Sequence, residues 1–480
     1  MKKKFLKNLA LILFLNLLIK PIYILGIDTA VQNQVGAASY GIYYAVFNLS
    51  FILTIILDFG ITNFNNKNIA QNNHLLTKHF SSLVGLKIVL ALIYILVLII
   101  IGITIGYDTR LMKLLLIQGF NMFLIFFILY LRSNLAGLHL FKTDSVVSVI
   151  DRLILIGLCL FMLKAGVFNG PNGIMYFVYA QTFSYFITAV TAFIIILKKT
   201  HTFKLTFNWT FSLMILKKSL PFATLILLMS FSRIDTVMIE RMLPKGVGDV
   251  QSGIYAQAFR LLDATSMIAF LVAGMLLPIF SRMLKFKESV EPLVLLISRL
   301  LLMPAIIIGV GCVFYSEELM GMLYHEHVQE SAEIFSLLML SFIGISVNYI
   351  FGTLLTANGS MKQLNIMYGL SMVFYIVSNY FLITEHKAFG AAITSMATQF
   401  LTAIIQVVIA QRIFRFKVNY RLINTFILFT IGVVALNYGS KLLHFSWMVN
   451  FAIMVVSCGL WAFITGIISI KSMFRLLKYG

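Results

Sequence analysis

Three cations lie in stretches of sequence that are otherwise almost entirely apolar: Lys20, Arg233 and Arg260. A charge at the centre of a membrane span costs about 2.5–3.5 kcal/mol on insertion scales, so such residues are retained where they face a cavity or a partner. Arginine offers a planar fork of donors that matches phosphate oxygens, and lysine adds a point charge. The three residues therefore predict a binding site for an anionic, phosphate-like group near the middle of a membrane.

Four carboxylates share these apolar stretches and are candidates for ion coupling: Asp28, Asp235, Glu240 and Asp263. A carboxylate in a cavity can alternate between binding H⁺ or Na⁺ and pairing with an arginine. The alternative is structural, because Asp263 stands at i,i+3 from Arg260 and Asp235 stands close to Arg233, so that each pair could simply neutralise itself. The carboxylates near helix ends could equally be caps. No feature of the sequence selects H⁺ over Na⁺.

Two further arginines, Arg132 and Arg152, lie near the inner ends of their stretches. They predict an access site for an anionic group on the cytoplasmic side, and the alternative is that they snorkel to the membrane interface. Nothing in the sequence predicts a catalytic centre, an organic cofactor or a metal site. The cysteines lie inside apolar runs, and His325 and His327 form the one close histidine pair.

The composition identifies the class of protein. Of the 480 residues, 60% are hydrophobic and only 11% are charged, against roughly a quarter charged in soluble domains. A single soluble core stops growing near about 250–300 residues and could not hide so much apolar surface. We therefore expect an all-α polytopic membrane protein. The net charge of +20 then reflects basic loops beside anionic lipid and does not indicate nucleic-acid binding.

Apolar runs long enough to cross a bilayer, about 20 residues each, occur about fourteen times. The first run follows a short lysine cluster but is too long for a signal peptide, so we expect it to be retained. The predicted spans are 8–29, 37–63, 80–105, 112–138, 145–167, 173–197, 219–241, 253–281, 293–316, 331–356, 362–383, 388–411, 421–442 and 448–470. The longest predicted connection runs from Lys198 to Lys218. Most of the lysines and arginines in the connections fall on one side if both termini are cytoplasmic, which predicts that orientation.

The sequence also repeats itself. The segment 35–49 matches 247–261 at Val-Gly, Gly-Ile-Tyr, Phe and Leu, and each match is offset by the same 212 residues. The repeat opens spans two and eight, which run in the same direction. This predicts two parallel six-helix lobes, residues 1–205 and 206–415, around a central cavity, followed by two C-terminal helices in 416–480.

Several motifs resemble the Wzx-type polysaccharide and O-antigen repeat-unit flippases of the MOP (MATE/MviN-like) superfamily. The matching residues, in chain order, are Leu57-Asp58-Phe59-Gly60, Arg132-x-Asn134-x-x-Gly137, Val149-Ile150-Asp151-Arg152-Leu153, Pro221-Phe222-Ala223, Arg233-x-Asp235 and Gly253-Ile254-Tyr255-Ala256-x-Ala258-Phe259-Arg260. The resemblance implies a two-lobed bundle that is not an enzyme. It also implies transport of undecaprenyl-diphosphate-linked oligosaccharide repeat units from the inner to the outer leaflet of the bacterial cytoplasmic (inner) membrane, for surface polysaccharide or lipopolysaccharide biosynthesis. The partners implied are the lipid-linked oligosaccharide, membrane lipids and the polysaccharide polymerase machinery, with the flippase itself a monomer.

Three alternatives stay open at this point. A MATE-like cation-coupled antiporter would share the two-lobed plan, but a cation exporter needs an acidic cavity. The predicted mid-membrane set carries three cations against two carboxylates, Asp235 and Asp263, because Asp28 and Glu240 lie nearer the outer ends of their spans. A lipid II flippase is a close variant of the first reading. A membrane polymerase or glycosyltransferase would need a large or acidic outer loop, and the first predicted outer loop, 29–36, holds no carboxylate.

Overall fold

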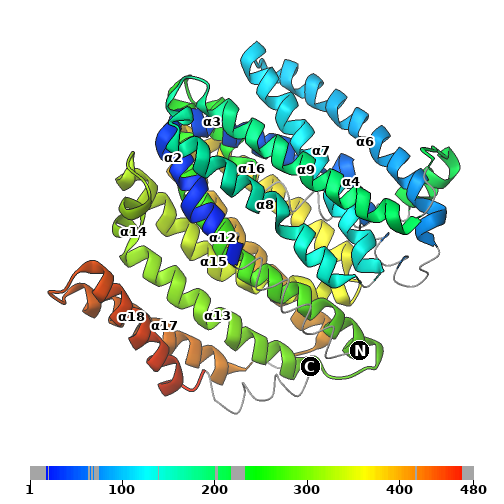
Figure 1. The fold of residues 1–480 in the computed structure, drawn as a ribbon. Coiled ribbons are helices and arrows are strands. Elements are labelled where there is room, and N and C mark those ends of the chain that lie inside the picture. Colours follow the sequence, from blue (N-terminus) through cyan, green and yellow to red (C-terminus); the bar gives the residue numbers. More distant parts are fainter. Residues whose placement is uncertain are drawn as a thin grey trace. The chain divides into compact units, whose positions relative to one another are not determined.

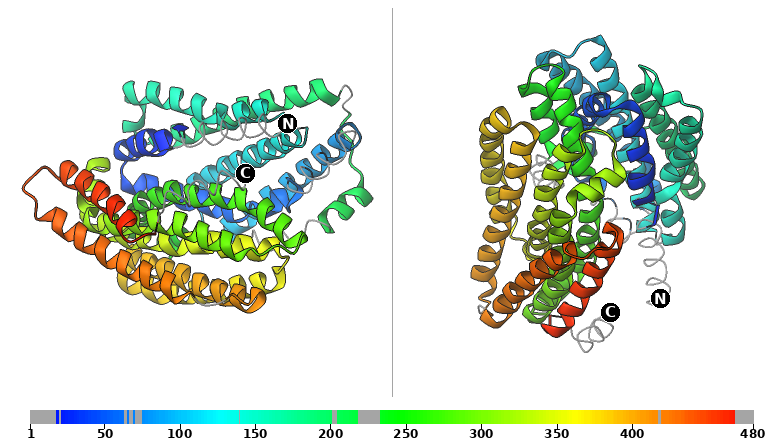
Figure 2. Two further views of the ribbon diagram at one scale, coloured as in Figure 1. Left: turned by 90° about the horizontal axis from the view of Figure 1, so that it is seen from below. Right: turned by 90° about the vertical axis from the view of Figure 1, so that its left-hand side faces the viewer.

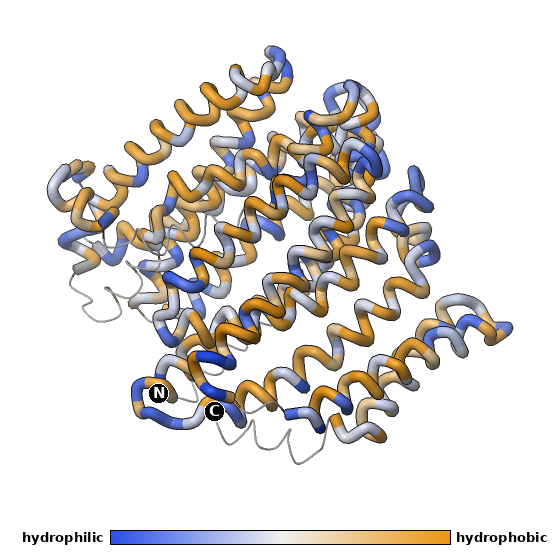
Figure 3. Tube along the Cα trace, turned by 180° about the vertical axis from the view of Figure 1, so that it is seen from behind, coloured by the Kyte–Doolittle hydropathy of each residue, from blue (hydrophilic) through white to orange (hydrophobic). Residues whose placement is uncertain are grey.

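A computed structural model shows that the chain is built of long helices (Figure 1). It describes residues 18–19, 21–62, 65, 69, 75–138, 140–200, 204–217, 233–416 and 419–467. Within these residues, 10 helices are long and apolar enough to cross a membrane. Apolar residues run along their lengths and hydrophilic residues gather at their ends (Figure 3). The predicted all-α membrane architecture is confirmed.

The long helices match the predicted spans in order. They are α6 (Leu75–Ile105), α7 (Thr109–Gly137), α8 (Phe141–Lys164), α9 (Gly173–Thr200), α12 (Val247–Lys285), α13 (Glu291–Phe314), α15 (Val328–Ala357), α16 (Met361–Phe414), α17 (Tyr420–Lys441) and α18 (Trp447–Ile464). The second predicted span is divided into α3 (Ala37–Ile52) and α4 (Ile55–Asp58). Half of the first predicted span and most of the seventh lie outside the described residues.

Helix α16 accounts for two predicted spans. It has 54 residues, and its backbone leaves the helical region at Lys387, with φ 52° and ψ −135°. A Cβ on Gly390 would overlap the carbonyl oxygen of Leu382, whereas residues eight apart in a straight helix are separated by about 12 Å. The chain therefore folds back at Lys387, as the predicted boundary between 383 and 388 requires.

Contacts divide the chain into two compact units, residues 1–253 and 254–480. In the first unit α7 packs on α6, α8 and α9, and α3 packs on α7 and on α11 (Asp235–Met242). Its main core is built from buried side chains of α6, α7, α8 and α9. The first turns of α12 belong to this unit. The lobe boundaries at 205 and 415 stay a prediction.

In the second unit α15 packs on α13 and α16, and the hairpin of α17 and α18 packs on α13 (Figure 2). The core of this hairpin includes Ile306, Phe429 and Met454. The short helix α14 (Ser316–Leu323) joins α13 to α15 and contributes Glu318, whose carboxylate pairs with Lys441 at the end of α17.

The connection predicted between spans six and seven contains a helix at 209–217 that the sequence reading did not predict. Asn208 begins it, because the Asn208 Oδ1 accepts a hydrogen bond from the Phe211 backbone amide at 2.9 Å, as an N-cap residue does. Ile215 is buried in the same core as α6 and α9. This burial stabilises a helix that is too short to persist alone.

Candidate functional site

A π-helical segment, η1 (Tyr23–Asp28), lies in the second half of the first predicted span. It continues directly into α2 (Thr29–Val35). Tyr23 and Asp28 are buried, and the Tyr40 hydroxyl donates a 2.8 Å hydrogen bond to Oδ2 of Asp28. Asp28, the predicted coupling residue, is the last residue of this π-helical segment. π-helical turns occur frequently at functional sites, which favours a functional role for Asp28.

Arg152 lies on the other side of Tyr23. Its guanidinium is 5.0 Å from the Tyr23 ring centroid and 5.7 Å from that of Tyr185, and Nη1 donates to the Tyr185 hydroxyl at 3.1 Å. The nearest Asp151 oxygen is 3.7 Å from Nε. Arg152 is thus held largely by aromatic faces, through cation–π attraction.

Helix α9 completes this group. Gln181 Nε2 donates to the Tyr43 hydroxyl at 2.8 Å, and the rings of Tyr43 and Tyr40 are 5.4 Å apart. We call the whole set the Asp28–Arg152 cluster: Tyr23, Asp28, Tyr40, Tyr43, Arg152, Gln181 and Tyr185.

The sequence reading missed Gln181 and Tyr185. A signal for them exists, because Gln181, Ser184, Tyr185 and Thr188 follow the i, i+3, i+4, i+7 pattern of one helix face. All four are buried. A buried polar stripe on an otherwise apolar membrane helix indicates a face turned to polar partners within the bundle.

An aromatic row on α3 runs from this cluster toward Arg233. Its rings stack at 6.1 Å from Tyr40 to Tyr44, 6.0 Å from Tyr44 to Phe47 and 6.4 Å from Phe47 to Phe51. The guanidinium of Arg233 lies 4.8 Å from the centroid of the last ring, Phe51. Asp28 therefore bonds to the first ring of the row and Arg233 stacks on the last.

The other mid-membrane residues are distributed as follows. Asp235 is the first residue of α11 and is buried. Arg260 and Asp263 lie on α12 in the second unit and are both partly buried. Lys20 lies outside the described residues. Of the described residues in this set, Arg233 and Asp235 fall in the first unit and Arg260 and Asp263 in the second. The phosphate site of Lys20, Arg233 and Arg260 stays a prediction.

Arg132 and Glu240 each contact an oppositely charged neighbour. Arg132 Nε on α7 lies 2.7 Å from Oδ1 of Asp144 on α8. A phosphate at the predicted access site would therefore compete with the Asp144 carboxylate. Glu240 Oε2 lies 2.8 Å from Arg241 Nε. Asp28, at the equivalent position of the repeat, instead accepts a hydrogen bond from Tyr40.

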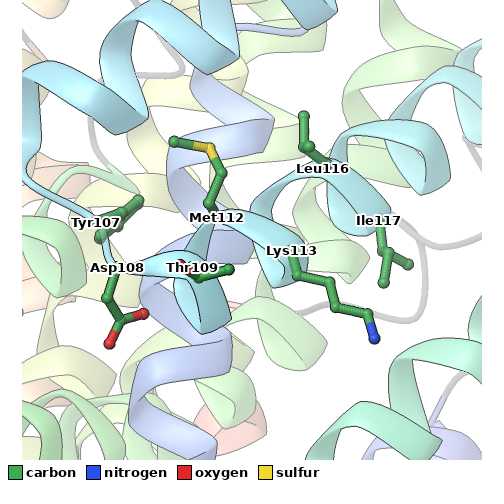
Figure 4. A pocket seen from close by; sticks show the side chains of 7 residues that line it. All are labelled: Tyr107, Asp108, Thr109, Met112, Lys113, Leu116 and Ile117. Atoms are coloured by element: carbon green, nitrogen blue, oxygen red, sulfur yellow. The ribbon is translucent and has the colours of Figure 1, made fainter.

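A short aromatic contact lies at the far end of α11. The Arg241 guanidinium is 4.2 Å from the Tyr107 ring centroid, in the turn between α6 and α7. Burial, together with the negative charge of Glu240, raises the pKa of Tyr107 to about 12. An open pocket beside Tyr107 is formed mainly by the first turns of α7 (Figure 4). None of its lining residues belongs to a predicted site.

The repeated segments meet within the first unit. A Cβ on Gly41 would lie 2.6 Å from the Gly253 backbone nitrogen. The Ser252 hydroxyl donates to the Gly41 carbonyl oxygen at 3.1 Å, and Gln32 Nε2 donates to the Gly253 carbonyl oxygen at 3.1 Å. Asn48 Nδ2 donates to Thr236 Oγ1 at 2.9 Å. These polar contacts join α2 and α3 to α11 and the start of α12.

The comparisons with known proteins agree with this fold. Residues 5–284 match the family described as "Polysaccharide biosynthesis protein". No curated protein matches the sequence.

Solved structures share the fold at low sequence identity. The lipid II flippase MurJ in an inward closed conformation has a TM-score of 0.69 at 12% identity, covering 96% of this chain and 98% of its own. An inward-facing multidrug resistance MATE transporter of the MOP superfamily has a TM-score of 0.67 at 14% identity, covering 82% of this chain and 94% of its own. A MOP superfamily transporter from Pyrococcus furiosus has a TM-score of 0.61 at 14% identity, covering 86% and 96%.

These solved structures are of membrane transporters and a lipid II flippase, and this chain shares their fold. The chain belongs to the polysaccharide biosynthesis protein family, with the fold of the MOP superfamily.

Proposed function

We propose that this protein is a flippase that moves undecaprenyl-diphosphate-linked oligosaccharide repeat units from the inner to the outer leaflet of the bacterial cytoplasmic membrane. The observation that carries the proposal is the family match over residues 5–284. Cations stacked on aromatic faces in the first unit support it, because they suit an anionic diphosphate attached to a sugar. The second candidates are a lipid II flippase and a MATE-like antiporter, which the fold likeness favours equally.

In this proposal the diphosphate is bound near the middle of the membrane by Lys20, Arg233 and Arg260. A bidentate guanidinium would replace the hydration that a dianion loses on leaving the inner surface. Arg132 and Arg152 would attract the head group on the cytoplasmic side. Phe51 supports the role of Arg233, because a guanidinium 4.8 Å from the ring centroid is already partly ordered and would lose less rotamer freedom on binding.

Coupling to H⁺ or Na⁺ would act through Asp28, with Asp235, Glu240 and Asp263 as further candidates. Protonation of Asp28 or cation binding to it would change its hydrogen bond with Tyr40. Tyr40 is the first ring of the row that ends at Arg233. A change at Asp28 would in this way alter the packing of the aromatic row that holds Arg233, the proposed ligand of the phosphate. The two arrangements of this row would favour the two conformations that alternating access requires. No other cofactor is required.

Both termini would be cytoplasmic, and the protein would act as a monomer beside the polysaccharide polymerase machinery. The transported repeat units would be used to build O-antigen or a related surface polysaccharide.

The test is transport by the purified full chain in vesicles. A lipid-diphosphate-linked oligosaccharide is placed in one leaflet, and a glycosidase is added that reaches only the other leaflet. Cleavage of the oligosaccharide then measures how much glycolipid has crossed the bilayer. Lipid II and ethidium are assayed in parallel vesicles. The proposal expects the oligosaccharide to move, with loss of movement in Arg233→Ala. Ethidium transport without glycolipid movement would establish the antiporter, and movement of lipid II alone would establish the peptidoglycan variant.

A further inference from the structure

The segment 204–217, which follows α9, carries apolar side chains on two opposite sides. One side packs on the first unit: Ile215 is buried among α6 and α9 side chains, and the Phe211 ring stacks on His79 with centroids 4.6 Å apart. The Ser82 and Thr206 hydroxyls are 3.1 Å apart. A Cβ on Gly85 would overlap the Thr206 carbonyl oxygen, so the segment lies directly against α6.

The other side of the segment is apolar and exposed. Leu205 is 60% exposed, Trp209 64% and Leu213 37%. Trp209 and Leu213 are separated by one helical turn, so they project from the same face of the helix 209–217. The Phe207 ring lies 6.1 Å from the Trp209 ring and is also exposed. Large aromatic residues that are exposed beside a membrane bundle suit the boundary between head groups and acyl chains.

The charge around this face is entirely positive. Exposed lysines stand at both ends of the segment, Lys204 and Lys217, and at the end of α9, Lys198 and Lys199; Lys78 is exposed at the start of α6. The sequence holds no Asp or Glu from Phe59 to Tyr107 or from Leu153 to Ile234. The two stretches that build this region therefore offer no carboxylate to neutralise the lysines.

We propose that residues 204–217 form an interfacial anchor that binds the surface of an anionic bilayer, with Trp209 and Leu213 at the acyl boundary and the lysines on lipid phosphates. A lysine near such a surface attracts anionic lipid, and a single-sign cluster adds several such attractions. A purely hydrophobic protein partner would not need the lysines. The inference concerns the lipid contact of this segment and does not depend on the transported substrate.

The test uses the full chain with Trp209 as its sole tryptophan. Trp447→Phe and Trp461→Phe remove the other two of the 3 tryptophans. The protein is reconstituted into vesicles of phosphatidylcholine, with or without phosphatidylglycerol. Lipids brominated near the head group should quench Trp209 more strongly than lipids brominated at the chain ends, and phosphatidylglycerol should strengthen the quenching.

Lys204→Gln with Lys217→Gln should raise several-fold the phosphatidylglycerol fraction needed for half-maximal quenching. Lys113→Gln is the matched control, because Lys113 is an exposed lysine on α7, away from the segment 204–217. This substitution should leave the phosphatidylglycerol fraction for half-maximal quenching unchanged. Free quenching by aqueous iodide without bromolipid quenching would overturn the proposal. Protection from both quenchers would overturn it as well, since it would show that protein covers the face.

Trp461 lies on α18 and packs against the core of the α17–α18 hairpin, so a second probe avoids replacing it. A bimane probe at Thr210→Cys gives the same measurement in the otherwise unchanged chain, because Cys159, Cys312 and Cys458 are buried. Bimane emission that does not shift to the blue when phosphatidylglycerol is added would count against the anchor in the same way.

Discussion

Gly41 and Gly253, which hold the same position in the two copies of the repeat, pack against each other's helices reciprocally. A Cβ on Gly41 would overlap the carbonyl oxygen of Asp249, and a Cβ on Gly253 would overlap that of Ala37. Asp249 itself follows Ala37 by the repeat offset of 212 residues. Gly41 contacts Asp249 and Gly253 contacts Ala37, so the two contacts are equivalent under the repeat. Such reciprocal contacts are typical of an isologous interface around a two-fold axis.

This reciprocity predicts equal effects of matched substitutions. Gly41→Ala and Gly253→Ala should each force α3 and α12 apart, with a destabilisation of about 1–3 kcal/mol from overpacking. Transport in the vesicle assay should fall to a similar extent in both. Gly157→Ala is the control, because a Cβ there meets nothing within 4 Å. Wild-type stability in detergent for either variant would contradict the close contact.

A buried ion pair should control the stability of the first unit. Lys87 Nζ lies 2.6 Å from Asp58 Oδ1 and donates to the Leu57 carbonyl at 2.9 Å, and both side chains are buried. Lys87→Met would leave a buried carboxylate without its cation, at a cost of about 3–5 kcal/mol. Thermal unfolding in detergent should show the loss. The double variant Lys87→Met with Asp58→Asn should recover part of it, and a double variant no more stable than Lys87→Met would refute the pairing argument.

The proposed phosphate ligands are distinguished by conservative substitution. Arg233→Ala and Arg260→Ala should abolish glycan export while the protein remains in the membrane. Arg260→Lys should be intermediate if charge alone matters and nearly inactive if the bidentate fork matters. Export is measured in cells that depend on this gene, with membrane levels checked by immunoblot. Wild-type export in both alanine variants would exclude the site.

Asp28 should carry the coupling, if the cluster works as proposed. Asp28→Asn should make transport insensitive to an imposed H⁺ or Na⁺ gradient, while exchange without a gradient continues. Tyr40→Phe removes the 2.8 Å hydrogen bond and should weaken the response less. Glu240→Gln, at the repeat-equivalent position, is the comparison, and a gradient response lost only in Glu240→Gln would transfer the role to that residue.

The orientation is open to a direct test. Reporter fusions after Lys204 should be active in the cytoplasm, and fusions after Glu318 should be active outside. The excess of lysine and arginine in the predicted inner connections is the physical reason. The opposite pair of results would invert the predicted topology and, with it, the leaflet that 204–217 contacts.

The sequence predicted the long helices well because twenty consecutive apolar residues have few other stable arrangements. It placed a boundary between 383 and 388, where the backbone does reverse at Lys387. The predicted span eight begins at residue 253, whereas α12 begins at Val247. The first two turns of α12 hold polar residues that pack on α3, and their low hydropathy is typical of a loop.

The partner of each individual charge was harder to predict from the sequence. The pairing of Lys87 with Asp58 depends on α4 lying against α6, which no local sequence pattern predicts. Gln181 and Tyr185 became visible only when α9 was seen to face Tyr43 and Arg152. The π-helical turn at Tyr23–Asp28 has no sequence signature of its own. Local patterns predict helices, whereas contacts between helices need the tertiary arrangement.

The reversal at Lys387 bears on how this chain can change in length over evolution. Two membrane-crossing segments meet there with one non-helical residue between them, and Gly390 already touches Leu382. An inserted residue would have no loop to occupy and would rotate one segment against the other by about 100°. Insertions and deletions among relatives should therefore be absent from this turn.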